Sequence, residues 1–277
     1  MQRTVAAVLL TFPAAAGAEA LLAAEVIVVT GRALPAPEPI SSSQFLDSAA
    51  LEASSRRLDV ALQQVPSLQI FRRASSASAS QTAQGLTLRG LGGNAASRVL
   101  VTLDGVPQSD LFAGWAAFAP LSAAPLESAT VEPGSGGARL FGGAAPGGRI
   151  ALQSALGENR LAVRGGSRDA IDVAAGLALP TGSGIFSLFA AHAQGSGHLL
   201  VDPARAGPAD VPARFRQSAL GGRIVAPLDS ETELQARLAA YSDRRRRGTE
   251  AGLSLAEGAD AAARLVHRGR WGAEAIA

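Results

Sequence analysis

The chain of 277 residues contains no cysteine and no lysine, and aromatic residues make up only 4% of it. Without cysteine the protein has no disulfide, no thiol nucleophile and no cysteine-bound zinc. Without lysine, P-loop phosphate binding and Schiff-base catalysis are excluded. The remaining polar residues form no convergent catalytic set in a strand–elbow–helix context. We therefore expect no enzyme, no catalytic residue, no metal ion and no cofactor.

Long apolar runs are also missing. The first apolar stretch, Val5 to Phe12, is shorter than the roughly 20 residues that a membrane-spanning helix needs. Arg3 precedes it, and the small residues Ala16-Gly17-Ala18 follow it, which is the pattern of a secretory signal peptide. We predict this peptide over residues 1–18, with a buried N-terminal helix as the alternative. If the chain enters a membrane, it must do so as a β-barrel.

Glycine (31 residues) and proline (15 residues) are abundant and divide the next part of the chain into short elements. A β-branched strand is predicted over residues 25–32, and a Pro- and Ser-rich linker over residues 33–46. Helical spacing of apolar residues predicts a helix between Asp47 and Gln64, with Asp47 or Ser48 as its cap. Asp104-Gly105 is a hairpin turn signal. Strands are predicted at 67–71, 85–89, 98–103, 128–132 and 149–153.

From Asn159 onward, polar and apolar residues alternate with period two, as in barrel strands. The connections at 180–184 and 227–230 are short, whereas those at 194–213 and 243–259 are long, which is typical of an outer-membrane barrel. A soluble β-sandwich would show a similar alternation. About seven strands are predicted, at 159–166, 169–179, 184–193, 214–226, 231–242, 260–267 and 270–277.

Several glycine-containing motifs follow one another in a fixed order between residues 85 and 152. They are Leu88-Arg89-Gly90, Leu103-Asp104-Gly105-Val106-Pro107, Leu140-Phe141-Gly142 and Ala145-Pro146-Gly147-Gly148. In this order, behind a signal peptide and a β-branched strand, they resemble the plug domain of TonB-dependent outer-membrane receptors. The resemblance covers about residues 25–155 and extends weakly into 157–277.

The resemblance implies a mostly β fold. A plug domain of mixed short strands and helices is expected over residues 47–156. It is followed by antiparallel strands of an incomplete transmembrane β-barrel over residues 157–277. The family's barrel has about 22 strands, and about seven cannot close around a plug. The sequence is therefore expected to be a truncated receptor or a fragment of one.

The resemblance also implies roles for individual residues. The strand before the linker is similar to a TonB box, which would add as a strand to the periplasmic protein TonB, although it fits an ordinary first strand as well. Its residues are Glu25, Val26, Ile27, Val28, Val29 and Thr30. The plug motif residues are Arg89, Gly90, Asp104, Gly105, Gly147 and Gly148. In the family, the arginine of the first motif faces the barrel wall.

Two departures from the family pattern concern the contact between plug and barrel. Thr130 stands where family members usually carry an acidic residue. Pro133-Gly134-Ser135 stands where they carry Arg-Gly-Pro, and that arginine pairs with carboxylates of the barrel wall. These departures weaken the expectation of the usual lock between plug and wall and indicate a divergent or degraded member of the family.

In this family the substrate meets the upper loops of the plug, which correspond here to Arg72–Gln81 and Gln108–Phe118. Arginines there would attract an anionic chelate and aromatic side chains would offer apolar contact; the alternative is that the aromatics pack inside the plug. The candidate substrate-facing residues are Arg72, Arg73, Gln108, Asp110, Phe112, Trp115 and Phe118.

The run Arg244 to Arg247 is expected on an external loop. There it would meet lipopolysaccharide phosphates or remain solvated. Aromatic residues are not interleaved with it, so nucleic acid is not expected as a partner.

The function that these observations favour is a receptor and transporter in the cell outer membrane for a scarce nutrient, such as a siderophore or another metal chelate. Its expected partners are TonB, outer-membrane lipid, lipopolysaccharide and the small-molecule substrate. The alternative is a soluble, exported β-rich binding or adhesion protein.

Overall fold

The computed structural model describes a subset of the chain, and the structural statements below refer to it. The predicted signal peptide, the TonB-box-like strand and most of the linker lie outside the described residues. No helix among the described residues is long and apolar enough to cross a membrane. The described residues are 43–53, 57–71, 85–90, 98–108, 114–118, 121, 126–134, 147–156, 159–268 and 273–276.

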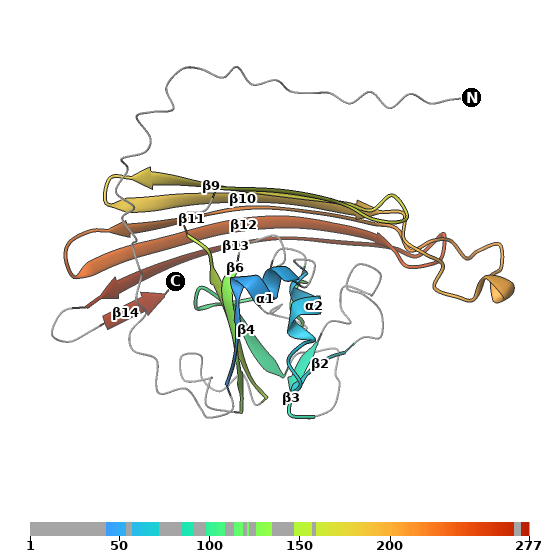
Figure 1. Cartoon of the computed structure of the whole chain (residues 1–277), viewed down its shortest axis with the longest axis horizontal. Helices are drawn as coiled ribbons and strands as arrows, with labels where there is room; N and C mark the ends of the chain where they lie inside the picture. Colours follow the sequence, from blue (N-terminus) through green and yellow to red (C-terminus); the bar gives the residue numbers. More distant parts are fainter. Residues whose placement is uncertain are drawn as a thin grey trace, which may run out of the picture. The chain divides into compact units, whose positions relative to one another are not determined.

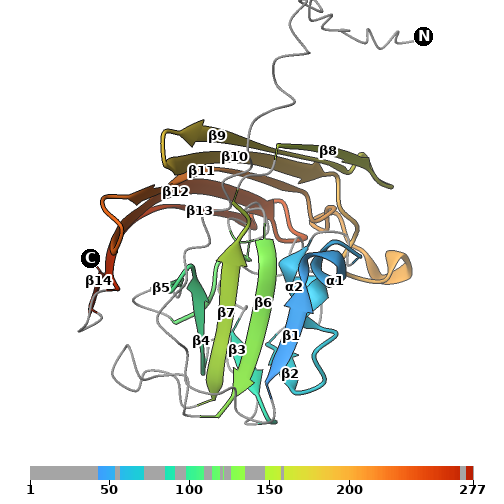
Figure 2. The same ribbon diagram turned by 60° about the vertical axis from the view of Figure 1, so that its left-hand side comes forward.

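The first part of the chain forms a five-stranded sheet with the order β1-β6-β7-β4-β5, and Figure 2 shows β1, β6, β7 and β4 side by side. Only the pair β4–β7 is parallel, and its register begins at Val99 opposite Gly148. A second, two-stranded sheet pairs β2 with β3. The bounds are β1 Gln44–Asp47, β2 Leu68–Ile70, β3 Leu86–Leu88, β4 Val99–Leu103, β5 Val106–Pro107, β6 Leu126–Pro133 and β7 Gly148–Ser154.

Two short helices replace the single helix predicted between Asp47 and Gln64. They are α1, Ser48–Ala53, and α2, Leu58–Leu62. The predicted Asp47 cap is confirmed, because its carboxylate accepts a hydrogen bond of 2.8 Å from the backbone N–H of Ala50. The linker prediction extends too far, since β1 begins at Gln44 and pairs with β6.

The core of this domain is built from leucine and valine side chains of the helices and strands. Leu62, Leu88, Ile150 and Leu152 are fully buried in it. Across β6 and β7, the guanidinium of Arg149 donates two hydrogen bonds, of 3.0 and 3.3 Å, to the carboxylate of Glu132. This bidentate pair ties the edges of two central strands together.

The predicted hairpin turn at Asp104-Gly105 is confirmed. Both residues have positive φ, 54° and 86°, and they join β4 to β5 through the pair Leu103–Val106. Positive φ at both central residues is the geometry of a tight hairpin, and Asp and Gly are residues that tolerate it. The turn fixes the direction of the Asp104 side chain.

The second part of the chain forms a seven-stranded antiparallel sheet in strict sequence order from β8 to β14, and Figure 1 shows β9 to β13 running side by side. All seven strands predicted by the alternation are present. Their bounds are β8 Arg160–Gly165, β9 Ile171–Thr181, β10 Gly184–Gly195, β11 Phe215–Pro227, β12 Thr232–Arg246, β13 Leu253–His267 and β14 Ala273–Ile276.

The turn between β11 and β12 is short and held by one carboxylate. Asp229 accepts hydrogen bonds from the backbone N–H groups of Glu231 and Thr232, at 2.8 and 2.7 Å. These hydrogen bonds lower the pKa of the Asp229 carboxyl, and the bond from the Glu231 N–H has the largest effect. The charged side chain thus stabilises the tight reversal between two long strands.

The long connection predicted at 243–259 is wrong. β12 continues to Arg246 and β13 begins at Leu253, so only residues 247–252 connect them. Arg244, Arg245 and Arg246 are therefore strand residues, not residues of an external loop. An unbroken run of one residue type hides the alternation: Arg245 is buried and pairs with Asp243, while its two neighbours point to the other face.

The seven-stranded sheet has an apolar face and a polar face. The apolar face is exposed and the polar face is buried, which is the reverse of the arrangement in a soluble protein. On β12, the charged and polar residues Glu233, Gln235 and Arg237 are buried, whereas Leu238 is 62% exposed. The strand register places all exposed large apolar residues of these strands on one face. They are Leu161, Val163, Ile171, Leu177, Leu179, Leu188, Leu220, Leu238, Leu253, Leu255 and Leu265.

Candidate functional site

The Asp104 carboxylate at the tip of the β4–β5 hairpin is the centre of the candidate site. Its side chain is buried and receives two hydrogen bonds from Ser154 at the end of β7. The backbone N–H of Ser154 donates to Oδ1 at 2.9 Å, and its hydroxyl donates to Oδ2 at 2.8 Å. These bonds hold the carboxylate in one orientation and leave it able to accept further donors.

A guanidinium from the seven-stranded sheet supplies that further donor. Arg223 of β11 reaches Asp104 Oδ1 at 2.8 Å through Nη1, which also donates to the Ser154 hydroxyl at 2.7 Å. Its Nη2 donates to Gln235 of β12 at 3.0 Å. The side chains of Arg223 and Asp104 are 13% and 5% exposed, so this ion pair between the two sheets is largely desolvated.

Two more arginines of the polar face lie against the same hairpin. Arg237 of β12 donates to the Gln108 side chain at 3.4 Å and pairs with Asp260 of β13 at 3.3 Å. Arg264 of β13 lies 3.5 Å from the position that a β-carbon on Gly105 would occupy. Three adjacent strands thus present one arginine each to residues 104–108.

The strand register shows why the hairpin carboxylate matters. Arg223 lies directly opposite Arg237 in the β11–β12 pair. Like charges directly opposite each other destabilise a sheet, and a buried guanidinium needs a carboxylate or equivalent acceptors. Asp104 supplies that carboxylate from the other sheet. The geometry is therefore that of an electrostatic latch, which we name the Asp104–Arg223 latch.

The structure places the predicted glycine motif residues at close backbone contacts. Gly148 has φ of +131°, and a β-carbon there would lie 2.3 Å from the carbonyl oxygen of Glu132. A β-carbon on Gly147 would lie 2.8 Å from the carbonyl oxygen of Arg98. Gly90, by contrast, has φ of +67° and open space around it. The first two positions need glycine for packing, and the third needs it for its backbone conformation.

Among the described residues, no hydrogen bond or ion pair joins Arg89 to the seven-stranded sheet. It has φ of 58°, and its Nη1 lies 3.7 Å from the position of a β-carbon on Gly134. Ionic contacts between the first domain and the seven-stranded sheet are made instead by Asp104 of the hairpin with Arg223 of β11 and by Glu52 of α1 with Arg160 of β8.

The predicted substrate-facing residues are not brought together in the described part of the structure. Phe118 is 2% exposed within the core, and Trp115 is 8% exposed, so both aromatic side chains pack in the interior. Gln108 bonds to Arg237 and to the carbonyl groups of its own hairpin. Arg72, Arg73, Asp110 and Phe112 lie outside the described residues.

The residues that surround the hairpin carboxylate were missed by the sequence analysis. Ser154 of β7 and the strand arginines Arg223 and Arg264 carry no motif, and Arg223 lies 119 positions after Asp104. The available signal was the alternation itself, because it places Arg223 on the face opposite Leu220 within a predicted strand. Among the described residues, no group of three or more His, Asp or Glu side chains is arranged to hold a metal ion.

Comparison with known proteins gives the first part of the chain a family. The model of the TonB-dependent Receptor Plug Domain family matches residues 36–149. A search of curated proteins gave no match.

Solved structures resemble the chain over most of its length at low identity. They include the siderophore receptor PirA from Acinetobacter baumannii (13% identity, TM-score 0.58, covering 85% of this chain and 39% of that one). The copper transporter OprC is similar at 17% identity and a TM-score of 0.59, with 84% of this chain and 35% of that one covered. The ferric enterobactin receptor PfeA from Pseudomonas aeruginosa is similar at 13% identity and a TM-score of 0.60, with 87% of this chain and 40% of that one covered.

This chain therefore spans 35% to 40% of the length of those three structures, and at these identities the likeness shows the fold. The matched segment contains β1 to β6 and the start of β7, and the seven-stranded sheet extends the structural similarity beyond it. Residues 36–149 thus match the model of the TonB-dependent Receptor Plug Domain, and the strands after them resemble the solved receptor and transporter structures in fold.

Proposed function

We propose that this chain forms the plug and part of the barrel wall of a TonB-dependent receptor of the outer membrane, which takes up a scarce small nutrient such as a metal chelate. The observation that carries the proposal is the wall itself. Its polar face holds a plug through the Asp104–Arg223 latch, and its other face exposes leucine side chains on six strands. Such a sheet suits a lipid environment on one side and a plug on the other.

The titles of the similar structures support the substrate class. They name a siderophore receptor, a copper transporter, and a ferric enterobactin receptor in complex with enterobactin. Metal chelates of this kind are often anionic, and arginine carries nearly all the cationic charge of this chain. Arg72 and Arg73 in the plug remain the proposed attractants for such a chelate.

The proposed mechanism moves a domain and breaks no covalent bond. Ligand capture on the plug would release the segment Glu25–Thr30 to the periplasm. TonB would engage that segment as an added β-strand, and the proton-motive force would then move the plug. Any movement of the hairpin away from the wall must break the Asp104–Arg223 latch, so the latch sets part of the barrier to transport.

Replacing Leu238 by Arg tests whether the apolar face meets lipid. Leu238 lies midway along β12 and is 62% exposed, while Leu228 lies in the short β11–β12 turn and is 59% exposed. In a bilayer, Leu238→Arg is expected to lower the free energy of unfolding by about 2–4 kcal/mol, and the control Leu228→Arg by about 0–1 kcal/mol. Urea titration of the native protein in liposomes measures both values.

If the chain were instead a soluble binding or adhesion protein, the two substitutions would have effects on stability different from those expected in a bilayer. Both leucines would face water, and both substitutions would then change stability by no more than about 0.5 kcal/mol. Equal, small effects of the two variants would therefore contradict the receptor proposal. The comparisons do not favour this alternative.

Deleting residues 25–30 tests the coupling role separately. The deletion is expected to reduce capture by the TonB C-terminal domain to the background of an unrelated bait, because the added strand is lost. Val28→Pro should weaken capture strongly, since proline cannot donate to the β-ladder, whereas Val28→Thr keeps both the N–H and the β-branched side chain. Capture of the deletion variant at the wild-type level would refute the coupling role. Both experiments use the native protein purified from outer membranes.

A further inference from the structure

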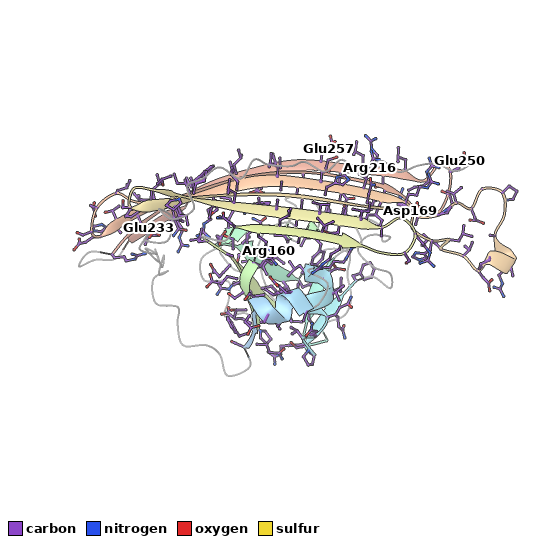
Figure 3. All side chains as sticks on the ribbon, turned by 45° about the horizontal axis from the view of Figure 1, so that its top comes forward. Arg160, Asp169, Arg216, Glu233, Glu250 and Glu257 are labelled. Atoms are coloured by element: carbon purple, nitrogen blue, oxygen red, sulfur yellow. The ribbon has the colours of Figure 1, made fainter. Side chains whose placement is uncertain are left out.

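Four arginines form a block at one end of the seven-stranded sheet, on its apolar face. Arg216 of β11 lies directly opposite Arg244 of β12. Just beyond this pair, the backbone N–H of Arg246 donates a hydrogen bond of 2.8 Å to the carbonyl of Arg214, which keeps the ends of β11 and β12 adjacent. We call Arg214, Arg216, Arg244 and Arg246 the arginine block. Figure 3 shows Arg216 toward this end of the strands and Glu233 toward the other.

The arginine block lines an open hollow of about 330 Å³. The residues directly opposite these arginines on the outer neighbouring strands are not acidic. Gln194 of β10 lies opposite Arg216, and Leu255 and Leu253 of β13 lie opposite Arg244 and Arg246. The hollow is lined by Asp169, Gln194, Gly195, Ser196, Arg214, Phe215, Arg216, Arg244, Arg245, Arg246 and Leu253.

Two carboxylates lie near the arginine block, and each accepts a hydrogen bond from a serine hydroxyl. Asp169 accepts a hydrogen bond of 2.8 Å from the Ser196 hydroxyl. Glu257, one row away on β13, accepts one of 3.1 Å from Ser242. Among the described residues, none of the four arginines forms an ion pair with a carboxylate. Cross-strand like charges destabilise a sheet, so an anion from outside the chain that occupies the hollow would stabilise this arrangement.

The position of the block along the strands identifies where that anion comes from. The strand connections at the opposite end are tight, at residues 182–183 and 228–231, whereas the connection 196–214 leaves from the block's own end. In outer-membrane barrels the short turns are periplasmic and the long loops extracellular. The block therefore lies at the outer leaflet, directly beyond the apolar residues Leu220 and Leu238 on the same face.

We propose that the arginine block binds the phosphate groups of lipopolysaccharide, whose acyl chains pack along the adjoining leucines. Guanidinium groups bind phosphate through paired N–H donors, and four of them suit a lipid that carries more than one phosphate. Leu253 and Leu255, which are 60% and 50% exposed beside the block, supply the apolar contact. The inference rests on the outer-membrane location in the proposed function and is independent of transport.

The test compares native protein purified in detergent with the double variant Arg216→Gln/Arg244→Gln. Lipopolysaccharide binding is expected to weaken by about tenfold or more, because two charge-assisted contacts are lost. The matched control is Arg205→Gln, which removes an exposed arginine of the 3-10 helix Pro203–Arg205 outside the hollow. Its affinity should equal that of wild type. Phosphatidylglycerol micelles serve as the second ligand, and they should bind wild type at least tenfold more weakly than lipopolysaccharide does.

Thermal unfolding gives a second readout that a misfolded variant would not reproduce. Without lipopolysaccharide, the double variant should unfold at the same temperature as wild type or higher, because the opposed charges are gone. With saturating lipopolysaccharide, wild type should become the more stable protein, since the lipid binds only its folded form with high affinity.

The outcomes separate this inference from the proposed function. Equal lipopolysaccharide affinity of wild type and double variant, in protein recovered from the outer membrane, overturns the arginine-block site alone. Equal binding of phosphatidylglycerol and lipopolysaccharide by wild type overturns the assignment to lipopolysaccharide. Absence of the native protein from the outer membrane overturns both this inference and the proposed function.

Discussion

Asp104→Asn is expected to lower the free energy of plug unfolding by about 3–5 kcal/mol, the usual effect of breaking a buried ion pair. The substitution keeps the side-chain shape, and asparagine tolerates the positive φ of 54° at this position. What it removes is the charge that faces Arg223 at 2.8 Å. Arg223 and Arg237 would then oppose each other across β11 and β12 without a carboxylate from the plug.

Trp115 provides the measurement. It is buried in the plug, and the chain has only one other tryptophan, Trp271, which is replaced by phenylalanine in all variants. Urea unfolding of the plug, followed by Trp115 fluorescence in outer-membrane vesicles, gives the free energy of each variant. The control Glu127→Gln neutralises an exposed carboxylate of β6 and should change this free energy by no more than about 0.5 kcal/mol.

A double-mutant cycle with Arg223→Gln separates the latch from its surroundings. If the latch is the dominant contact, Asp104→Asn/Arg223→Gln should be less destabilised than the sum of the two single variants, because each single variant leaves one buried charge unpaired. Strictly additive effects would mean that Asp104 and Arg223 do not interact in the native protein, and the latch would be withdrawn.

Gly148→Ala is expected to have the larger effect, a loss of about 4 kcal/mol or more in the same unfolding measurement. Gly148 begins β7, the strand between β6 and β4, and pairs with Pro133 on one side and Val99 on the other. Its φ of +131° disfavours any side chain, and a β-carbon would lie 2.3 Å from the Glu132 carbonyl oxygen and 2.8 Å from Leu88 Cδ1. The sheet must shift to accommodate it. Typical domains have only about 5–15 kcal/mol of stability, so plug folding itself is at risk.

Two further glycines separate the causes of that loss. Gly90 has φ of +67° but open space, so Gly90→Ala should show only the backbone term of about 1–2 kcal/mol. Gly165 at the end of β8 has no close neighbour and no positive φ, so Gly165→Ala should be neutral within about 0.5 kcal/mol. Equal effects at Gly148 and Gly90 would show that strain alone, without the steric clash, explains the requirement for glycine.

Local signals in the sequence predicted the elements of this fold well. Alternation with period two found all seven strands of the wall, and the Asp104-Gly105 pair predicted its hairpin. Both signals are local because side-chain direction alternates along a strand and because tight turns need specific residues. The one large error, the loop at 243–259, arose where four consecutive arginines concealed the alternation.

The functional contact was not predictable in the same way. Asp104 was identified as a turn residue, and the turn signal carries no information on what its carboxylate meets. Its partner Arg223 lies 119 residues later, and the choice between Arg223, Arg237 and Arg264 depends on how the hairpin docks on the wall. Pairing at such a distance is decided by three-dimensional packing and strand register, neither of which a local pattern specifies.

The position of β1 has a mechanical consequence. Among the described strands, β1 is an edge strand of four residues that pairs with β6 alone. A pulling force applied to residues before Gln44 therefore reaches β1 before the other described elements of the plug. The strands behind it, β6, β7 and β4, carry the fully buried side chains of Val131, Ile150 and Val101. Because β1 is short and lies at the edge, we expect it to separate from β6 under load before the buried strands of the sheet do.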